Sequence, residues 1–192
     1  MPTLDKKYTE KIKQHFLSYA TVRRDVIKQS DDALHLAKRA IFAMHRDDMA
    51  EAGIKLKESE MLLAKLQANA KKDPRVTDEG AYRAAVEEYV EAVLLQQFLQ
   101  KGSIGKITTL AVDPESYVAG LCDVPGELYR YAIKAATEKD IAMVKKCADM
   151  GQEIAGALIE FNLTSYLRNK FDQAKQAVQK LEQVVYEVSL RN

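Results

Sequence analysis

Hydrophobic residues recur at steps of three and four over most of the chain, which is the spacing of one face of an α-helix. The first such stretch predicts one very long helix over residues 4–45, with Ser30 as the place where it would bend. The apolar seam along which this helix would pack against another is formed by Leu34, Ala37, Ile41 and Met44.

Five further helices are predicted, separated by residues that break or begin helices. They are expected over residues 54–70, 79–100, from 113 through 130, over 137–161 and over 164–190. Asp47–Asp48 and Gly53 predict the turn before the first of these, and Thr77 or Asp78 is the expected cap of the second. Asp113-Pro114-Glu115 is a strong helix start, because it combines a capping carboxylate with proline in the first turn.

Two details complete the prediction of the fold. Pro125 lies well inside a predicted helix and removes one backbone donor, so a kink is expected there. The link over residues 101–112 is partly apolar and is expected to pack against the body. Without repeats or a domain boundary, the sequence predicts a single all-α domain over residues 1–192, with six or seven long antiparallel helices in a bundle.

Composition agrees with a helical protein and limits the function classes. Only 8 Gly and 4 Pro occur in 192 residues, and the net charge is +1, so a nucleic-acid surface would need local clustering of basic residues. No apolar run approaches the roughly 20 residues that span a bilayer, and the first residues lack a signal-peptide core. Cys122 and Cys147 lack metal-ligand spacing and fit buried thiols in a reduced cytoplasmic compartment.

The segment Val86–Leu99 combines an apolar helix pattern with three glutamates, Glu87, Glu88 and Glu91. No Lys or Arg lies between Arg83 and Lys101. Carboxylates on a helix that is buried on more than one side are costly unless a positive charge meets them. A bound cation is therefore the first hypothesis for this segment.

Spacing joins two of these acids to two others. Glu88 and Glu91 are three residues apart, and Asp123 and Glu127 are four apart, so each pair lies on one face of its helix. Side by side, the two helices would gather four oxygen ligands suited to one or two Mg²⁺ or Mn²⁺ ions acting on a phosphodiester. The alternative is that both pairs are solvated helix faces. A di-iron site is not expected, because no His follows a Glu at the required spacing.

Basic side chains on the predicted helices suggest contacts with a nucleic-acid backbone, with a solvated face as the alternative. The residues selected for such contacts are Arg24, Lys38, Arg39, Arg46, Arg83 and Arg130. For Arg130, a salt bridge to the acids is equally compatible with its spacing from Asp123. The isolated residues His15, His35 and His45 do not predict a metal site.

Four segments together resemble the translin family, and most closely its translin-associated factor X branch. They are E-Y-V-E-A-V (Glu88–Val93), G-L-C-D-V-P-G-E-L-Y-R (Gly120–Arg130), A-K-R-A-I-F-A-M-H-R (Ala37–Arg46) and K-L-E-Q-V-V-Y-E-V-S-L-R (Lys180–Arg191). The likeness covers essentially the whole chain. Pro125 departs from it, because the family commonly has a small polar residue at that position.

The resemblance implies an all-α chain that assembles into a hollow, roughly octameric barrel binding single-stranded RNA or DNA. In the factor X branch the barrel encloses a Mg²⁺-dependent endoribonuclease site, whose acids correspond by motif to Glu88, Glu91, Asp123 and Glu127. Glu127 would be either a ligand or a general base for the attacking water. Translin proper lacks these acids and binds without cutting. A compact chain of prokaryotic or archaeal type would form a homo-oligomer.

Two alternatives to the nuclease remain at this stage. One is a translin-like protein that binds single strands of RNA or DNA without chemistry, and the other is a purely structural helical oligomer. Oligomers are expected in each case, because the long first helix and the C-terminal seam offer more apolar surface than one small bundle hides. Glu87 lies outside the matched motif and is expected at the surface or in an ion pair.

Overall fold

The computed structural model describes residues 3–190, except for the side chain of Thr21, and this part of the chain contains helices and no strand. Arg191, which belongs to one of the quoted motifs, lies outside the described residues. The helices are α1 (Lys6–His45), α2 (Met49–Ala70), α3 (Arg75–Asp78), α4 (Gly80–Lys101), α5 (Pro114–Thr137), α6 (Ile141–Ile159) and α7 (Ser165–Ser189). The prediction of an all-α fold is confirmed.

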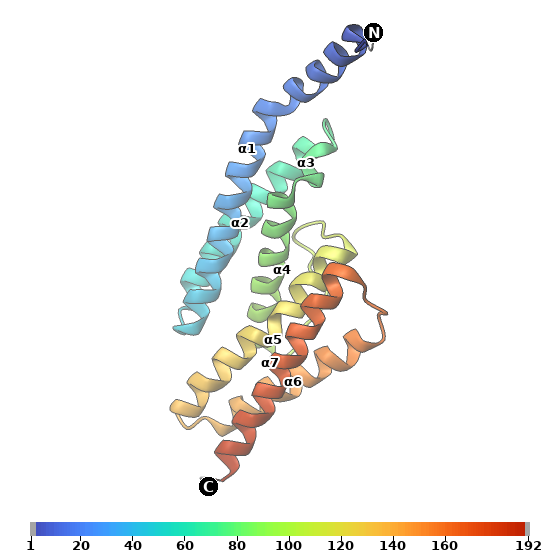
Figure 1. The fold of residues 1–192 in the computed structure, drawn as a ribbon. Coiled ribbons are helices and arrows are strands. Elements are labelled where there is room, and N and C mark those ends of the chain that lie inside the picture. Colours follow the sequence, from blue (N-terminus) through green and yellow to red (C-terminus); the bar gives the residue numbers. More distant parts are fainter. Residues whose placement is uncertain (1–2, 191–192) are drawn as a thin grey trace.

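Helix α1 runs without interruption through Ser30, and its N-terminal end projects beyond the other helices (Figure 1). Its predicted seam faces the core, where Ala37, Ile41 and Met44 are buried. The seam of α7 is buried in the same way at Phe171, Ala174, Val178 and Leu181. The three- and four-residue spacing therefore identified the buried faces of both helices.

Two groups of three long helices make up the fold: α1, α2 and α4 on one side, and α5, α6 and α7 on the other (Figure 1). Helices joined by short turns run antiparallel, as predicted. Helices α4 and α5 instead run in the same direction, because the link 102–113 returns along the molecule before α5 begins. Ile107 and Leu110 anchor that link in the core, which confirms that it packs against the body.

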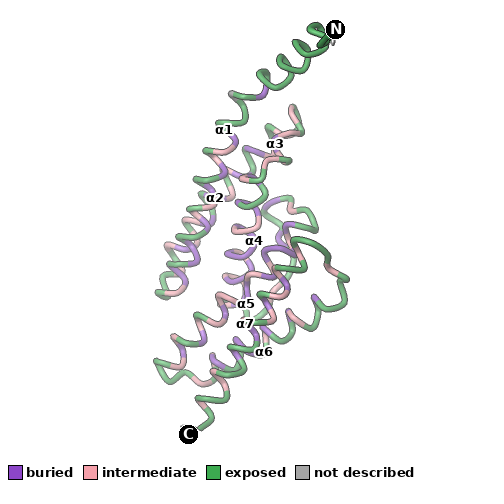
Figure 2. The backbone as a smooth tube through the Cα atoms, in the orientation of Figure 1, coloured by how far each residue is buried: buried purple, intermediate pink, exposed green. Residues whose placement is uncertain are grey.

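Helix α4 is the member of the first group that packs against the second, and it contacts both α1 and α5 (Figure 2). Ten of its residues are buried, among them Tyr89, Leu94 and Leu95, so α4 is covered on more than one side as its pattern indicated. Its contact with α5 is unusually close at Gly120. A Cβ atom there would lie 2.7 Å from the carbonyl oxygen of Glu87 and 2.6 Å from Val90 Cγ1. Glycine at this position therefore allows the acidic turn of α4 to lie directly against α5.

Several helix ends differ from the prediction because capping carboxylates decide them. Helix α2 begins at Met49, since Asp48 accepts a hydrogen bond from the backbone N–H of Glu51, and Gly53 lies inside the helix. Helix α5 continues to Thr137, and α6 begins only after Asp140, which accepts a hydrogen bond from the N–H of Met143.

The expected cap of the second predicted helix is wrong. Thr77 and Asp78 belong to the short helix α3, and the N-cap of α4 is Glu79, which makes no side-chain capping hydrogen bond. Asp113 does cap α5 as predicted, by accepting a hydrogen bond of 2.9 Å from the N–H of Ser116. Pro125 lies within α5, which is assigned as one helix on both sides of it.

Both cysteines are buried free thiols, and burial raises the pKa of Cys122 to about 11 and that of Cys147 to about 12. They therefore contribute to the core as small apolar side chains. Over the described part of the chain, no helix combines the length and the hydropathy that crossing a membrane requires.

Candidate functional site

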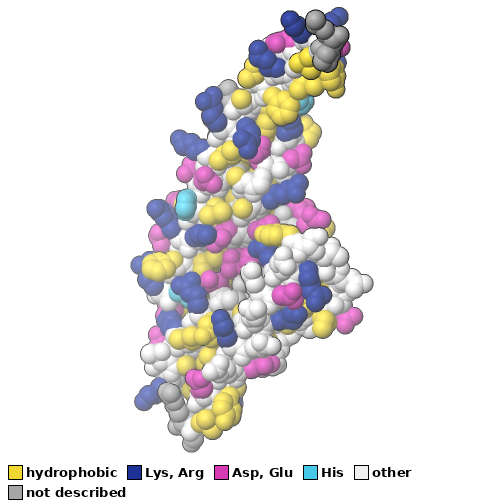
Figure 3. Space-filling view, in the orientation of Figure 1, with side chains coloured by type: hydrophobic (Ala, Val, Ile, Leu, Met, Phe, Trp, Pro, Cys, Tyr) yellow, Lys and Arg dark blue, Asp and Glu magenta, His cyan; other side chains and the backbone are white. Residues whose placement is uncertain are grey.

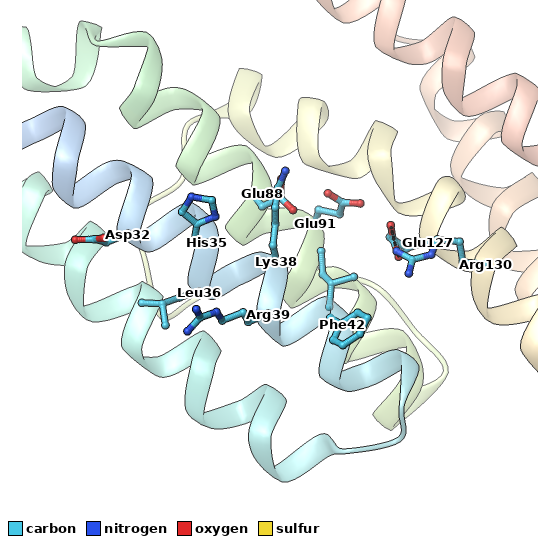
Figure 4. Close-up of a pocket in the computed structure, with 11 residues that line it drawn as sticks. Asp32, His35, Leu36, Lys38, Arg39, Phe42, Glu88, Glu91, Glu127 and Arg130 are labelled. Atoms are coloured by element: carbon cyan, nitrogen blue, oxygen red, sulfur yellow. Dashed lines mark hydrogen bonds and ion pairs between the residues drawn. The ribbon is translucent and has the colours of Figure 1, made fainter.

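The parallel contact between α4 and α5 brings the four predicted acids into one electrostatic cluster. The charges of Glu88, Asp123 and Glu127 all act on Glu91. Three of the four, Glu88, Glu91 and Glu127, line a groove of about 980 Å³ whose other wall is α1 (Figure 4). Figure 3 shows acidic side chains gathered near the middle of this face, bordered by Lys and Arg side chains along α1.

Glu91 is the most buried acid of the cluster, with 8% of its surface exposed. Its carboxylate has no hydrogen-bond or ion-pair partner among the described residues, and it faces the groove (Figure 4). Burial, and then the nearby charges of Glu88, Asp123 and Glu127, raise the pKa of Glu91 to about 9. Without a cation Glu91 therefore holds a proton at neutral pH.

Asp123 is paired with a lysine that sequence reasoning missed. Lys170, from α7, donates a hydrogen bond to Asp123 Oδ2, and its Nζ lies 3.2 Å from Glu87 Oε2. Tyr166 Oη donates to the same Glu87 oxygen over 2.7 Å. Burial raises the pKa of Asp123, while Lys170 opposes the shift. Glu87 is thus a pairing residue, one of the two roles expected for it.

Glu127 is held by two basic side chains. His45 Nε2 forms a hydrogen bond with Glu127 Oε2, and Arg130 Nη1 lies 3.1 Å from the same oxygen. Burial alone would raise the pKa of Glu127, but the hydrogen bonds from His45 and Arg130 outweigh it, and the pKa lies below its ordinary value. Glu127 is therefore ionised at neutral pH.

Glu88 has the weakest ion pair of the three paired acids. Lys38 Nζ lies 3.7 Å from Glu88 Oε2, and the lysine side chain is largely exposed. Burial raises the pKa of Glu88, with Lys38 opposing the shift and the charges of Asp123 and Glu127 adding to it. Glu88 and Glu91 are thus the two acids that the chain's own bases stabilise least.

Bases meet three of the four acids, although no Lys or Arg lies between Arg83 and Lys101 in the sequence. Lys38, His45 and Lys170 approach them from helices that are remote in sequence, at separations that include 47 and 82 residues. No local pattern indicates such pairs, because they depend on how helices pack. Glu91 is the one acid of the four with no such base among the described residues, and a bound cation stays a hypothesis for it.

The donor set fits a hard divalent cation in its chemistry, since all four candidates offer carboxylate oxygens and Glu91 is a buried acid with no partner in the described part of the chain. As the described side chains stand, no group of three or more His, Cys, Asp or Glu residues is arranged to hold a metal ion. Asp123 and Glu127 point to their basic partners instead. Residues that would hold the ion are therefore present, and some would have to reorient.

The six basic residues selected from the sequence separate into two groups. Lys38, Arg39 and Arg130 line the groove with the acids, and Arg46 lies beside it, over the ring of Phe42. Arg24 is exposed on α1 and does not line the groove, whereas Arg83 pairs with Asp78 and lines a different pocket. The salt-bridge alternative for Arg130 is the one observed, with Glu127 as its partner.

Comparison with known proteins shows the family of this chain. Residues 21–192 match the translin family, to which the chain therefore belongs. It is 31% identical to chicken translin over 81 residues, which are 42% of this chain and 35% of that protein. The matched part thus spans about a third of the chicken protein's length.

Solved structures share the fold. The crystal structure of AfC3PO superposes with a TM-score of 0.86 at 23% identity, covering 96% of this chain and 98% of that chain. The AfC3PO–duplex RNA complex is similar to the same degree, with a TM-score of 0.86 at 22% identity over the same shares of the two chains. At such low identity these likenesses establish the arrangement of helices alone.

Replacing Glu91 by Gln is expected to stabilise the metal-free protein increasingly as the pH rises. The pKa of Glu91 is about 9 in the folded state and near 4.5 in the unfolded state, so the free energy of unfolding falls between these pH values as the unfolded state gives up its proton. Glutamine removes this loss. Urea unfolding in EDTA should show a gain of roughly 2–4 kcal/mol at pH 8 and little gain at pH 5.

The control for this measurement is Glu153→Gln, which changes an exposed glutamate on α6 and should leave the free energy of unfolding unchanged at both pH values. An effect of Glu91→Gln that is the same at pH 5 and pH 8 would contradict the proposed burial of an ionisable Glu91.

Proposed function

We propose that this protein is a metal-dependent endoribonuclease of the catalytic branch of the translin family, acting on single-stranded RNA inside an oligomeric barrel. The observation that carries the proposal is Glu91, a buried carboxylate that no described side chain pairs with and that faces a groove together with Glu88 and Glu127. Burying such a group is unfavourable unless a cation meets it. Family membership and the RNA complex of the structurally similar AfC3PO support RNA as the ligand.

Glu88, Glu91, Asp123 and Glu127 are the residues that would hold Mg²⁺ or Mn²⁺. The ion would supply charge neutralisation at the phosphodiester and a more acidic bound water. On the rim of the groove, Lys38, Arg39 and Arg130 offer positive charge to the phosphates of the chain being bound. In this proposal the acids of the groove act, through the ion, at the scissile phosphate. The basic side chains of the same groove bind the neighbouring phosphates.

Of the two roles open to Glu127, its surroundings favour that of ligand. A general base works best with a pKa near the working pH, whereas hydrogen bonds from His45 and Arg130 lower the pKa of Glu127. A carboxylate held ionised and fixed in direction is better suited to binding a cation. His45 would then keep Glu127 oriented, as partners of metal ligands commonly do.

An exposed aromatic ring supports the preference for single strands. Phe42 lines the groove with 55% of its surface exposed, although its neighbours Ile41 and Ala43 are buried. The Arg46 guanidinium lies over the ring, 4.7 Å from its centroid. Unpaired bases stack on such rings, and paired bases do not present a free face to them.

The runner-up function is binding of single-stranded RNA or DNA without cleavage. It is favoured by the pairing of Asp123 with Lys170 and of Glu127 with Arg130, which already neutralises half of the acidic set. This alternative predicts salt-sensitive binding that does not depend on divalent cations.

Assembly into a homo-oligomer, with an octamer as the expected size, is supported by the surface of α1. The N-terminal end of α1 projects beyond the other helices (Figure 1), and large apolar side chains are solvent-exposed there (Figure 3). They are Tyr8, Ile12, Phe16 and Leu17 within the helix, and Leu4 just before it. A contiguous apolar stripe of this kind is typical of an interface between subunits.

Alanine at Glu91 or Asp123 is expected to slow cleavage of unstructured RNA in Mg²⁺ by about 100-fold or more, because each change removes a carboxylate from the proposed site. RNA binding should persist, since removing negative charge does not weaken attraction to phosphates. Gel analysis of cleavage products gives the rate, with Glu153→Ala as a control of equal chemistry on an exposed surface. If both variants stay folded and cut as fast as the unmodified protein, the site is wrong.

Phe42→Ala is expected to weaken binding of an unstructured RNA by about 5- to 150-fold, the loss of one stacked base, and to leave duplex binding nearly unchanged. Phe42→Tyr should restore the affinity. Phe161→Ala is the matched control, because Phe161 has the same 55% exposure and does not line the groove. Fluorescence anisotropy measures both ligands, and equal losses for single strand and duplex would rule out stacking.

Light scattering after size exclusion is expected to give a mass that is a multiple of 21.6 kDa, near eightfold. Phe16→Asp combined with Leu17→Asp should lower that mass, because charges would enter the apolar stripe. Lys13→Asp, at the same exposed end of α1, controls for the added negative charge. A particle of 21.6 kDa at all micromolar concentrations would defeat the assembly proposal.

A further inference from the structure

Lys170 occupies a position between two helices that each contribute an acid to the cluster. Its ammonium donates a hydrogen bond to Asp123 Oδ2 on α5 and lies 3.2 Å from Glu87 Oε2 on α4. The lysine side chain is 14% exposed, and Tyr166 Oη fixes the orientation of Glu87 over 2.7 Å. Two carboxylates from different helices therefore converge on one positive atom.

This lysine remains charged in spite of its burial. Its Nζ lies within ion-pair distance of carboxylate oxygens of both Asp123 and Glu87, and these two negative charges hold the ammonium in its charged form. An ammonium group is a compact point charge, and in this setting it resembles a small cation more than a guanidinium does.

Charge balance divides the cluster into two halves. With Glu91 ionised, as it would be beside a bound cation, five carboxylates face three permanently charged bases, which leaves two negative charges, the charge that one divalent ion would neutralise. The carboxylates are Glu87, Glu88, Glu91, Asp123 and Glu127, and the bases are Lys38, Arg130 and Lys170. Lys170 compensates the charge of the half formed by Glu87 and Asp123. Glu91, which has no partner among the described residues, lies in the other half.

We propose that Lys170 is a built-in cation that takes the place of a second divalent ion, so that each chain binds one ion, at the Glu88–Glu91 half of the cluster. Asp123 links the two halves, because Lys170 engages its Oδ2 and leaves the second carboxylate oxygen for the ion. This inference rests on the proposed metal-dependent function. It assigns Lys170 a positioning role, since it acts through Asp123 and Glu87.

The test is the number of Mn²⁺ ions bound per chain by the full-length protein, counted by calorimetric titration and by the electron paramagnetic resonance signal of free Mn²⁺. The unmodified protein should bind one ion. Lys170→Met, which keeps most of the side-chain volume and removes the charge, should bind a second ion between the freed carboxylates. Lys170→Arg should bind one again, because it restores the positive charge.

The outcomes separate this inference from the function on which it rests. One ion bound by both the unmodified protein and Lys170→Met overturns the role of Lys170 and leaves the metal site standing. No ion bound by any variant overturns both. Two ions bound by the unmodified protein overturn the inference even if Lys170→Met fails to fold, and circular dichroism identifies that failure.

Discussion

The close approach of α4 and α5 at Gly120 is the constraint on which the acidic cluster depends. Because a Cβ atom at this position would lie within 2.7 Å of the Glu87 carbonyl oxygen, only glycine allows the two helices to meet there. The two helices run in the same direction from this contact. The acids about one turn further along, Glu91 on α4 and Asp123 on α5, are therefore also close together. Glu91 is then within reach of the charges of Asp123 and Glu127.

Bringing carboxylates together in a partly buried site is unfavourable, and the fold offsets most of that cost with bases from other helices. Lys170 of α7 meets Asp123, His45 of α1 meets Glu127, and Lys38 of α1 meets Glu88. Each pair also connects two helices. Glu91 is the exception. The cost of burying a carboxylate that no described base compensates is therefore concentrated at this one side chain, which faces the groove.

This arrangement relates the proposed binding and cleavage to a single surface. The wall contributed by α1 carries Lys38, Arg39 and the exposed ring of Phe42, while α4 and α5 supply the acids opposite. A nucleic-acid strand lying in the groove would contact the positively charged side chains and the Phe42 ring on one side. On the other side it would contact the carboxylates. Arg24 and Arg83 lie outside this surface, so any contact that they make with nucleic acid would form elsewhere on the molecule.

The sequence by itself determined the helices, their buried faces and the family, because helix periodicity, caps and motifs are local properties of the chain. It also identified the four acids, since spacings of three and four residues fix a shared helix face. Only the tertiary structure decided which bases meet these acids: Lys170 and His45 are 47 and 82 residues from their partners, and no local signal encodes such distances. The parallel course of α4 and α5 was likewise decided by packing, through the link 102–113 and the absence of a side chain at Gly120.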